Sequence, residues 1–397
     1  MNQLKYGIGL DISKEMFDAC ISVIDTEQKI TIKATSRFYN SLKGFNNFWE
    51  WTKRHLKLPL PVVYLMEATG IYYEQLAWFL YDKDARVTVI LPNKAKKYKE
   101  SLGLKSKNDT IDAEGLSRMV CEQNLKLWEP STKVIYTLRM ITRQIESISC
   151  HSTAVGNQLH ALNYGMYQDR AVEKMLEKQL ALLFNQKDEL EKRVESIVEQ
   201  SPILKEKFKK ILPIKGLGVQ TLAVIVAETD GFALIENQAQ LVSYAGYDVV
   251  ENQSGGHHGK TKISKKGNSH IRHAMFFPAF NVVRYDQGNF KNLNERIFER
   301  TKIKMKGYTA VQRKLLVLVY ALWKRNEKFD PNKGKKMKSR DTEPVSSFVS
   351  KLIETETDTH IDIDSVEGDV TISGKDSLQL YATREVIMAI GRGFNPE

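Results

Sequence analysis

The stretch LKYGIGLDIS, residues 4–13, forms the first structural element of the chain and decides which fold can be built around it. Its bulky residues alternate with two glycines, so one face is apolar and the other is nearly bare, and the run stops at Asp11. Alternation with a period of two predicts a β-strand. Two further strand-like runs, at 16–24 and 29–36, follow at once, so we expect a three-stranded meander.

The next elements alternate between helix and strand. A helix predicted at about 40–55 leads into an apolar strand at 61–66, and a second helix at about 71–82 leads into ARVTVILP at 85–92. Three antiparallel strands followed by alternating helices and strands form the element order of a ribonuclease-H-like α/β fold. A Rossmann domain would alternate from the start and carry GxGxxG, which this sequence lacks.

The charge of the chain is uneven. Residues 346–397 hold 10 Asp and Glu against 4 Lys and Arg, a net of −6; because the whole chain carries +11, residues 1–345 carry +17. A body this basic predicts a polyanionic partner, nucleic acid before membrane. The sequence has no apolar run of 18 residues, no signal-peptide pattern and only three scattered cysteines. We therefore expect a cytoplasmic, nucleoid-associated protein in a reducing compartment, with no membrane partner.

The middle of the chain, at about 130–210, reads as helical. Apolar residues recur there every seven positions, at Leu176, Leu183, Leu190 and Ile197, although Lys187 interrupts the companion seam. This spacing predicts an antiparallel helical pair or coiled coil, whose usual use is dimerisation.

The segment LPIKGLGVQTLAVIVAET, residues 212–229, then places Gly216 and Gly218 between apolar helical stretches. This is typical of a helix-hairpin-helix, in which backbone amides and a helix N-terminus approach a phosphate. A plain turn between two helices is the alternative. The predicted organisation is α/β plus α, with a mainly helical second domain and a small α/β tail. Its segments are a catalytic domain (1–128), a helical dimerisation region (129–208), a second domain (209–330), a polar linker (331–345) and the tail (346–397).

Four carboxylates stand at the ends of two predicted strands and at the start of a predicted helix. Asp11 ends the first strand, and Glu67 of MEATG (66–70) ends the fourth; in a ribonuclease-H-like sheet these two strands are neighbours. Asp109 and Asp112, three residues apart, share one face at the start of a helix. An N-cap plus a dipole contact would explain that pair alone. Together, the four predict ligands for Mg²⁺ and two-metal phosphoryl transfer on nucleic acid.

These motifs carry a family resemblance. GIGLDISKEMFDA, MEATGIYYEQLA and GLKSKNDTIDAEGLS resemble the DEDD domain of the transposases of insertion-sequence family 110, relatives of the Piv-type invertases. LPIKGLGVQTLAVIVAETDG and LVSYAGYDVVENQSGGHHGKTKISKKGNSHIRHAMF resemble the C-terminal domain of the same family. The resemblance spans about residues 5–330. It implies a RuvC-like domain, a coiled coil, a serine-bearing second domain and a bridge RNA that pairs with donor and target DNA.

The resemblance also implies a nucleophile. The family's serine corresponds to Ser254 in ENQSGGHHGK, within a Gly-rich, basic loop, although Ser264 or Ser269 could serve instead. A homodimer or tetramer is implied, because four strands must be exchanged. Clustered cations near this loop are predicted to contact phosphates, although a solvated charged face is the alternative; they are Lys260, Lys262, Lys265, Lys266 and Arg272.

The tail departs from the family. IDIDSVEGDVTI and REVIMAIGRGFNPE resemble part of an archaeal-type KH domain, but the usual GxxG clamp is missing. The leading hypothesis is an RNA-guided DNA transposase-recombinase with a Mg²⁺-dependent acidic site and a serine nucleophile. The alternatives are a RuvC-like structure-specific nuclease, which needs the acids but no serine, and a non-catalytic RNA-binding protein derived from a transposase.

Overall fold

The computed structural model describes residues 2–103, 109–233, 235–250, 253–254, 257–259, 262–285, 289–331, 362–364 and 371–373. These residues belong to two compact units, one ending at Pro130 and the other beginning at Ser131. Each unit is described by itself.

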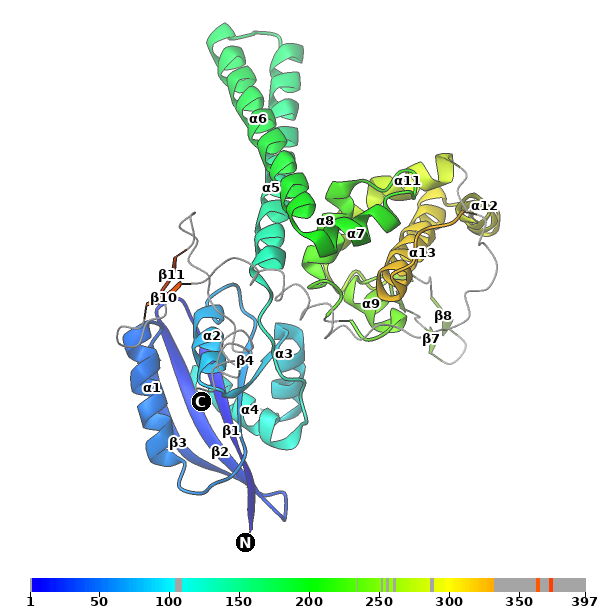
Figure 1. The fold of residues 1–397 in the computed structure, drawn as a ribbon. Coiled ribbons are helices and arrows are strands. Elements are labelled where there is room, and N and C mark those ends of the chain that lie inside the picture. Colours follow the sequence, from blue (N-terminus) through cyan, green and yellow to red (C-terminus); the bar gives the residue numbers. More distant parts are fainter. Residues whose placement is uncertain are drawn as a thin grey trace. The chain divides into compact units, whose positions relative to one another are not determined.

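The first unit is built on one five-stranded sheet (Figure 1). Its strands are β1 (Gln3–Ile12), β2 (Met16–Asp25), β3 (Ile30–Tyr39), β4 (Val62–Glu67) and β5 (Arg86–Ile90). They lie in the order β3-β2-β1-β4-β5, with β1, β2 and β3 antiparallel and β4 and β5 parallel to β1. The predicted meander and the adjacency of the first and fourth strands are therefore confirmed, and the sheet has the strand order expected of a ribonuclease-H-like fold.

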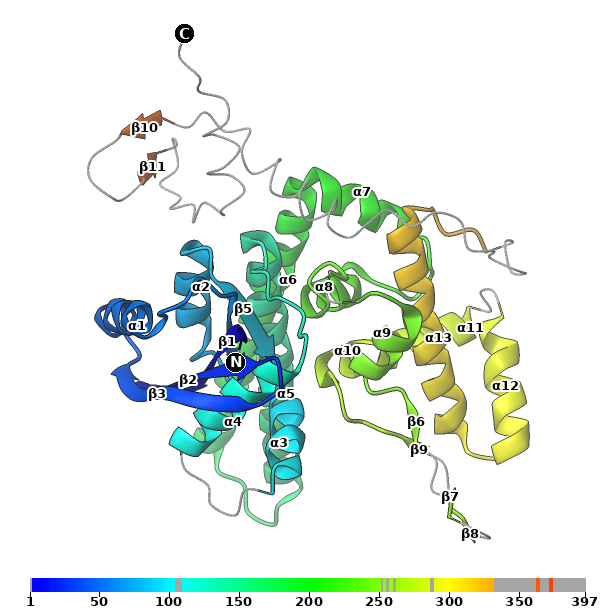
Figure 2. The same ribbon diagram turned by 90° about the horizontal axis from the view of Figure 1, so that it is seen from below.

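Helices cover both faces of this sheet (Figure 2). They are α1 (Leu42–His55), α2 (Glu74–Asp82), α3 (Pro92–Ser101) and α4 (Asp109–Glu122). On one face, the bulky alternating residues of β1 and β2 pack against aromatic and aliphatic side chains of α1 and α2. On the other, Val63 and Leu65 of β4 pack against Leu116, Met119 and Val120 of α4. Each helix thereby buries an apolar stripe that the sheet alone would leave in water.

The two glycines of β1 allow α4 to lie directly on the strand. A Cβ added at Gly9 would lie 2.1 Å from the carbonyl oxygen of Ala113, and one at Gly7 would lie 2.6 Å from the carbonyl oxygen of Ser117. Real Cβ atoms do not approach backbone this closely, so only glycine fits here. Around this contact the Ser117 hydroxyl lies 2.7 Å from that of Ser22 on β2, which ties the same helix to the neighbouring strand.

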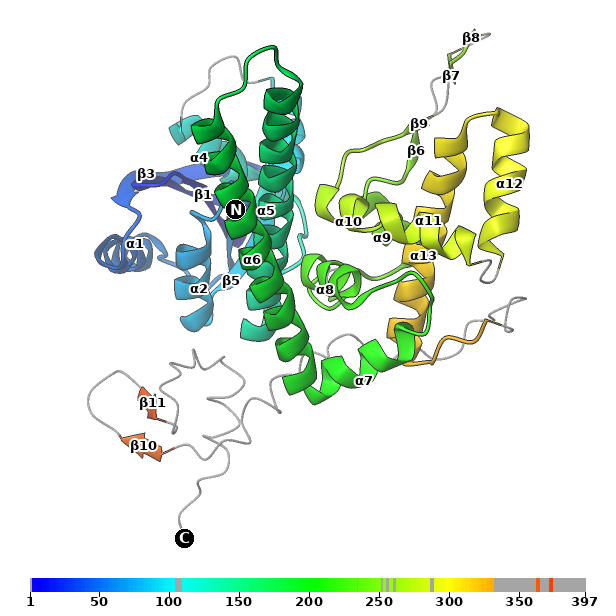
Figure 3. The same ribbon diagram turned by 90° about the horizontal axis from the view of Figure 1, so that it is seen from above.

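The second unit begins with a long helical hairpin. Helices α5 (Lys133–Tyr164) and α6 (Arg170–Gln200) lie side by side (Figure 3). Its base is packed into the core of the unit through residues such as Leu138 and Val194. The heptad positions of α6 are only half-buried towards the tip. The two long helices are established, and their coiled-coil use in dimerisation remains a prediction.

The rest of the second unit is mainly helical. Its helices are α7 (Pro202–Ile211), α8 (Val219–Glu228), α9 (Gln238–Tyr244), α10 (Ser269–Ala274), α11 (Phe276–Arg284), α12 (Phe290–Thr301) and α13 (Lys304–Arg325). Two short antiparallel pairs interrupt them, β6 (Val249–Val250) with β9 (Lys262–Ile263) and β7 (Gln253–Ser254) with β8 (His257–His258). The central helix is α13, whose buried residues join one core with α7, α8, α9 and α11.

Most of the predicted linker and tail lies outside the described residues. In the tail, the structure describes one antiparallel pair, β10 (Asp362–Asp364) with β11 (Thr371–Ser373), so the KH resemblance remains a prediction. No helix in the described part of the chain is long and apolar enough to cross a membrane.

The close packing of α4 on β1 predicts that a side chain at Gly9 lowers the stability of the protein. Gly9→Ala places a methyl group against backbone of α4, and overpacking of this kind costs about 1–3 kcal/mol or more of unfolding free energy. We expect a lower midpoint in urea unfolding monitored by circular dichroism. Gly156→Ala is the control, because a Cβ at Gly156 of α5 meets nothing within 4 Å. It should be neutral or stabilising by up to about 1 kcal/mol. Equal destabilisation by both variants would contradict the packing argument.

Candidate active site

The first two acids are brought together by the parallel pairing of β1 with β4. Leu10 pairs with Met66 in this register, so Asp11 and Glu67 stand next to each other at the carboxyl ends of the two strands. Side chains alternate along a strand, so Asp11 lies on the face of Gly7 and Gly9, the face that α4 covers. The sequence prediction that these two acids face one site is met by the backbone geometry.

Helix α4 supplies the other two acids. Asp109 and Asp112 lie in its first turn, and the next residue, Ala113, is the one that touches Gly9. The site is electrostatically crowded as a result. The pKa of Asp11 is raised to about 6, chiefly by burial and also by the negative charges of Asp112, Asp109 and Glu67, against an opposing effect of Lys99. The structure thus brings all four predicted acids into one region.

Lys99 of α3 was not predicted from the sequence, yet it lies among these acids. Its Nζ is 2.9 Å from Oδ1 of Asp112 and 3.7 Å from Oε2 of Glu67. Glu67 also accepts a hydrogen bond from the Thr69 hydroxyl at 3.1 Å. A lysine in a Lys-rich helix gives no sequence signal that singles it out, because its partners come from β4 and α4.

A second cation, Arg37, pairs with Asp109. Arg37 of β3 donates from Nη2 to Oδ2 of Asp109 at 3.1 Å and from Nε to Oδ2 of Asp18 at 2.9 Å. Asp18 is a buried fifth carboxylate on β2, directly opposite Asp11 in the register, and it also accepts from the Thr110 hydroxyl. The available sequence signal was an aspartate within the apolar strand MFDACISVI. Arg37 and Asp18 together fix the first turn of α4.

The chemistry of the donors fits a divalent cation such as Mg²⁺. Carboxylate oxygens are its preferred hard ligands, and Asp11, Glu67 and Asp112 form a partly buried acidic group that requires positive charge. Lys99 already places a cation between two of these acids. With the carboxylates engaged by Lys99 and Arg37, no group of three or more His, Cys, Asp or Glu among the described residues has the arrangement of a metal site. The donor set therefore fits such a cation by its chemistry, and in this structure the oxygens of Glu67, Asp109 and Asp112 are paired with side-chain cations.

The predicted nucleophile lies in the other unit. Ser254 is in β7 and pairs with His257 of β8; the structure describes the backbone there and not the side chains. Ser254 belongs to the stretch 251–261, and the residues on both sides of this stretch are held together. The amide of Ser264 donates to the carbonyl of Asp248 at 2.8 Å, and β6 pairs with β9. The segment therefore begins and ends at one fixed place in the second unit.

Arg272 contributes to the same base. Its Nη1 donates to the carbonyl oxygens of Ala245, Gly267 and Asn268, at 2.8, 3.2 and 3.1 Å. This gives Arg272 a role within the fold, and phosphate contact by its remaining donors stays a prediction. Among the predicted basic contacts, Lys262, Lys265 and Lys266 are exposed. Lys260 lies outside the described residues.

An ion pair between the half-exposed Arg143 and the buried Glu228 anchors α10 to α5 and α8. Helix α10 follows the serine segment, which is the stretch 251–261 that contains Ser254. Arg143 donates to both carboxylate oxygens of Glu228, at 2.7 and 2.9 Å, and Asn268, the N-cap of α10, donates to the same carboxylate. Burial by itself raises the pKa of Glu228, but the hydrogen bonds and charge of Arg143, together with Asn268, outweigh it and lower the pKa. Such a pair fixes geometry, because removing one partner leaves a buried charge.

The predicted helix-hairpin-helix corresponds to α7, a turn and α8. Gly216 in the turn has φ 97°, and a Cβ there would lie 2.4 Å from Cβ of Asn281, so packing and backbone both require glycine. Gly218 precedes α8, and a Cβ there would meet nothing within 4 Å. Phosphate binding at this turn remains a prediction, and Gly218 is the residue with open space for it.

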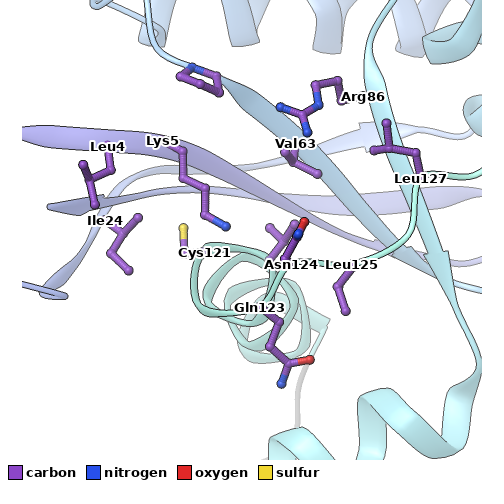
Figure 4. A pocket seen from close by; sticks show the side chains of 12 residues that line it. Leu4, Lys5, Ile24, Val63, Arg86, Cys121, Gln123, Asn124, Leu125 and Leu127 are labelled. Atoms are coloured by element: carbon purple, nitrogen blue, oxygen red, sulfur yellow. The ribbon is translucent and has the colours of Figure 1, made fainter. Parts of the chain in front are cut away.

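A separate cavity of about 330 Å³ lies at the opposite end of the sheet from the acids. It is lined by the first residues of β1, β4 and β5 and by the end of α4, and Figure 4 shows the Lys5 side chain extending towards Cys121. Lys5 and Asp11 are six residues apart on one strand, about 20 Å. This cavity is therefore distinct from the acidic site.

Comparisons with known proteins give matches in both units. Residues 8–165 match a transposase family model, and residues 209–295 match the model of the transposase IS116/IS110/IS902 family. The pilin gene-inverting protein of Moraxella bovis is 28% identical over 325 residues, covering 81% of this chain and 97% of that protein. The pilin gene-inverting protein of Moraxella lacunata is 27% identical over 324 residues, with the same coverage.

Solved structures of RuvC also match the chain. Thermus thermophilus RuvC covers 31% of this chain and 99% of its own, with 10% identity and a TM-score of 0.25. The same protein in complex with a Holliday junction substrate gives 11% identity and a TM-score of 0.24.

The crowded site predicts a specific pH dependence of stability in metal-free protein. The pKa of Asp11 is about 6 in the folded state against an ordinary value of 3.8, so between these pH values the folded state keeps a proton that the unfolded state has lost. The unfolding free energy should therefore fall as pH rises through this window, by up to about 3 kcal/mol. Asp11→Asn should remove that part of the slope in urea titrations from pH 4 to 8. An unchanged slope would contradict the assignment.

Proposed function

The chain belongs to the IS116/IS110/IS902 family of transposases and is a DNA recombinase, and we propose that it cuts and rejoins DNA with a divalent-metal site and a serine nucleophile, under the guidance of an RNA. The acids of the first unit hold the metal in this proposal, and Ser254 of the second unit attacks the phosphate. The observation that carries the proposal is the convergence of Asp11, Glu67 and Asp112 on the face of β1 that α4 covers.

The role of the acids follows from their environment. Carboxylates in this number repel one another in a partly buried site, so they favour the binding of a cation there. Asp11, Glu67, Asp109 and Asp112 would hold Mg²⁺. When bound, the cation polarises the scissile phosphate and stabilises the leaving oxygen. The hydrogen bond from Thr69 to Glu67 and the ion pair from Arg37 to Asp109 orient two of the ligands.

Ser254 is proposed as the nucleophile. Its hydroxyl oxygen would attack the phosphorus and form a phosphoserine bond as the bond from phosphorus to the 3′ oxygen breaks. The serine proton would pass to solvent and the 3′ oxygen would take one up, so no net proton is gained or lost. Ser254 is followed in sequence by Gly255 and Gly256, which add no side-chain bulk on that side, and the cations Lys262, Lys265 and Lys266 follow in sequence to stabilise charge on the phosphate. Because the acids and the serine belong to different units, the active site in this proposal is composite and assembles on DNA.

The helical hairpin supports assembly from more than one copy. Large apolar side chains near its tip are exposed, among them Tyr164, Met166, Tyr167 and Met175, and Phe184 is exposed midway along α6. An apolar surface of this kind favours burial against a partner. We infer that the partner is the same hairpin of a second copy, in a dimer or tetramer.

Replacing the serine tests the proposal directly. Ser254→Ala should abolish strand cleavage and covalent protein–DNA adducts while leaving DNA affinity within about two-fold, because the hydroxyl forms a bond only during the reaction. Adducts are trapped by denaturation during the reaction, and the linked residue is mapped by mass spectrometry. Ser264→Ala is the matched control, since Ser264 lies at the held base of the same segment and should remain active.

The outcomes separate the candidate functions. Adducts that persist in Ser254→Ala would move the nucleophile elsewhere, with Ser269 tested next. Cleavage with no adduct in either protein would instead indicate metal-dependent hydrolysis, as in a structure-specific nuclease.

The excess positive charge predicts a nucleic-acid cofactor. Purified protein should retain a specific structured RNA, and its affinity should fall steeply between 50 and 200 mM salt, because each phosphate contact releases a counterion. The measurement is sequencing of the co-purified RNA together with a salt series of filter-binding constants. Replacing Lys262, Lys265 and Lys266 by glutamine should flatten the salt dependence if they contact phosphates. Full recombination by RNA-free protein would contradict RNA guidance.

A further inference from the structure

The ammonium group of Lys99 lies within ion-pair distance of two of the acids of the first unit. Its ammonium contacts Asp112 at 2.9 Å and Glu67 at 3.7 Å, and these acids come from different elements, α4 and β4. The side chains of all three residues are largely enclosed, with exposed fractions of 18% for Lys99, 16% for Asp112 and 17% for Glu67. An ion pair with so little solvent is much less screened than one at the surface.

The fold gives this side chain a defined path into the site. Helix α3 begins at Pro92, directly after β5, and is held by the fully buried Ala95. On α4, Gly115 leaves room for the lysine stem, because a Cβ at that position would lie 3.1 Å from Cγ of Lys99. The stem of Lys99 therefore packs against α4 at Gly115, and its ammonium lies at the acids in a largely enclosed position.

The same helix contains a contrasting pair. Lys96 lies 3.8 Å from Glu100, with exposed fractions of 74% and 63%. Such a surface pair contributes little to stability. Lys99, in contrast, neutralises acids that would otherwise repel one another inside the protein.

We propose that Lys99 is an internal counter-ion that holds Glu67 and Asp112 together in the metal-free protein and that a divalent cation must displace to bind. The oxygens that contact the ammonium are oxygens that the cation needs, so the two positive groups compete for them. The lysine stem is flexible, so the ammonium can leave without moving the backbone of α3. The inference rests on the proposed metal site and adds to it a cost of loading the metal.

Metal affinity tests the competition. In metal-free full-length protein, Lys99→Met should lower the thermal melting temperature, because the acids lose their counter-ion. It should also tighten Mn²⁺ binding about ten-fold in isothermal titration calorimetry, a size comparable to the effect of one nearby charge on a carboxylate. Lys99→Arg, which keeps the charge, should bind Mn²⁺ more weakly than Lys99→Met. Lys96→Met is the matched control on the same helix and should leave both quantities unchanged.

These results distinguish this inference from the proposed function. If the wild type binds Mn²⁺ and Asp11→Asn abolishes binding, the metal site stands. An unchanged or weaker Mn²⁺ affinity in Lys99→Met would then overturn the counter-ion role alone. If the wild type binds no Mn²⁺ at these acids, the metal site and the counter-ion role both fail.

A measurement on the unaltered chain guards against a variant that does not fold. Lysine acylation followed by mass spectrometry, with and without Mn²⁺, reports how available each ammonium is. Displacement predicts several-fold faster labelling of Lys99 when Mn²⁺ is present and no change at Lys96. Equal or slower labelling of Lys99 on addition of Mn²⁺ would overturn the proposal.

Discussion

The contact between α4 and the bare face of β1 is the constraint on which the rest of the first unit depends. Because Gly7 and Gly9 have no side chains, the backbone of α4 comes closer to the strand than any Cβ would allow. This short distance sets the first turn of α4 above the ends of β1 and β4. The acids of that turn therefore meet Asp11 and Glu67, and a displaced helix would leave two separate acidic pairs in place of one site.

Acids this close to one another repel, and two cationic side chains of the same unit offset part of that repulsion. Asp109 is held by Arg37, which also neutralises the buried Asp18, while Lys99 serves Glu67 and Asp112. These ion pairs connect α4 to β3, to β4 and to α3. Burial and the negative charges of Asp112, Asp109 and Glu67 still raise the pKa of Asp11 to about 6, against the opposing effect of Lys99. A bound cation would relieve the repulsion among these carboxylates.

In the second unit, the segment that contains Ser254 is held at both of its ends. The pairing of β6 with β9, the carbonyl contacts of Arg272 and the ion pair of Arg143 with Glu228 all lie at or beside the two ends of the serine segment. Order at the base limits where the segment can reach. For the proposed role of Ser254 this restriction is favourable, because positioning contributes strongly to the rate of phosphoryl transfer.

Local pattern in the sequence determined the strands of the first unit, their order and the places of the four acids. Alternation identified β1, and the acids stood out because each ends a strand or begins a helix; the strands and the convergence of the acids are found in the structure. Lys99, Arg37 and Asp18 were missed, since their partners lie on other elements. The prediction for Arg272 overlooked the carbonyl oxygens it binds, and that for Gly216 overlooked Asn281. Sequence fixes periodicity and conformational preference within one element, whereas the partner of a charge depends on distances that exist only after the elements have packed.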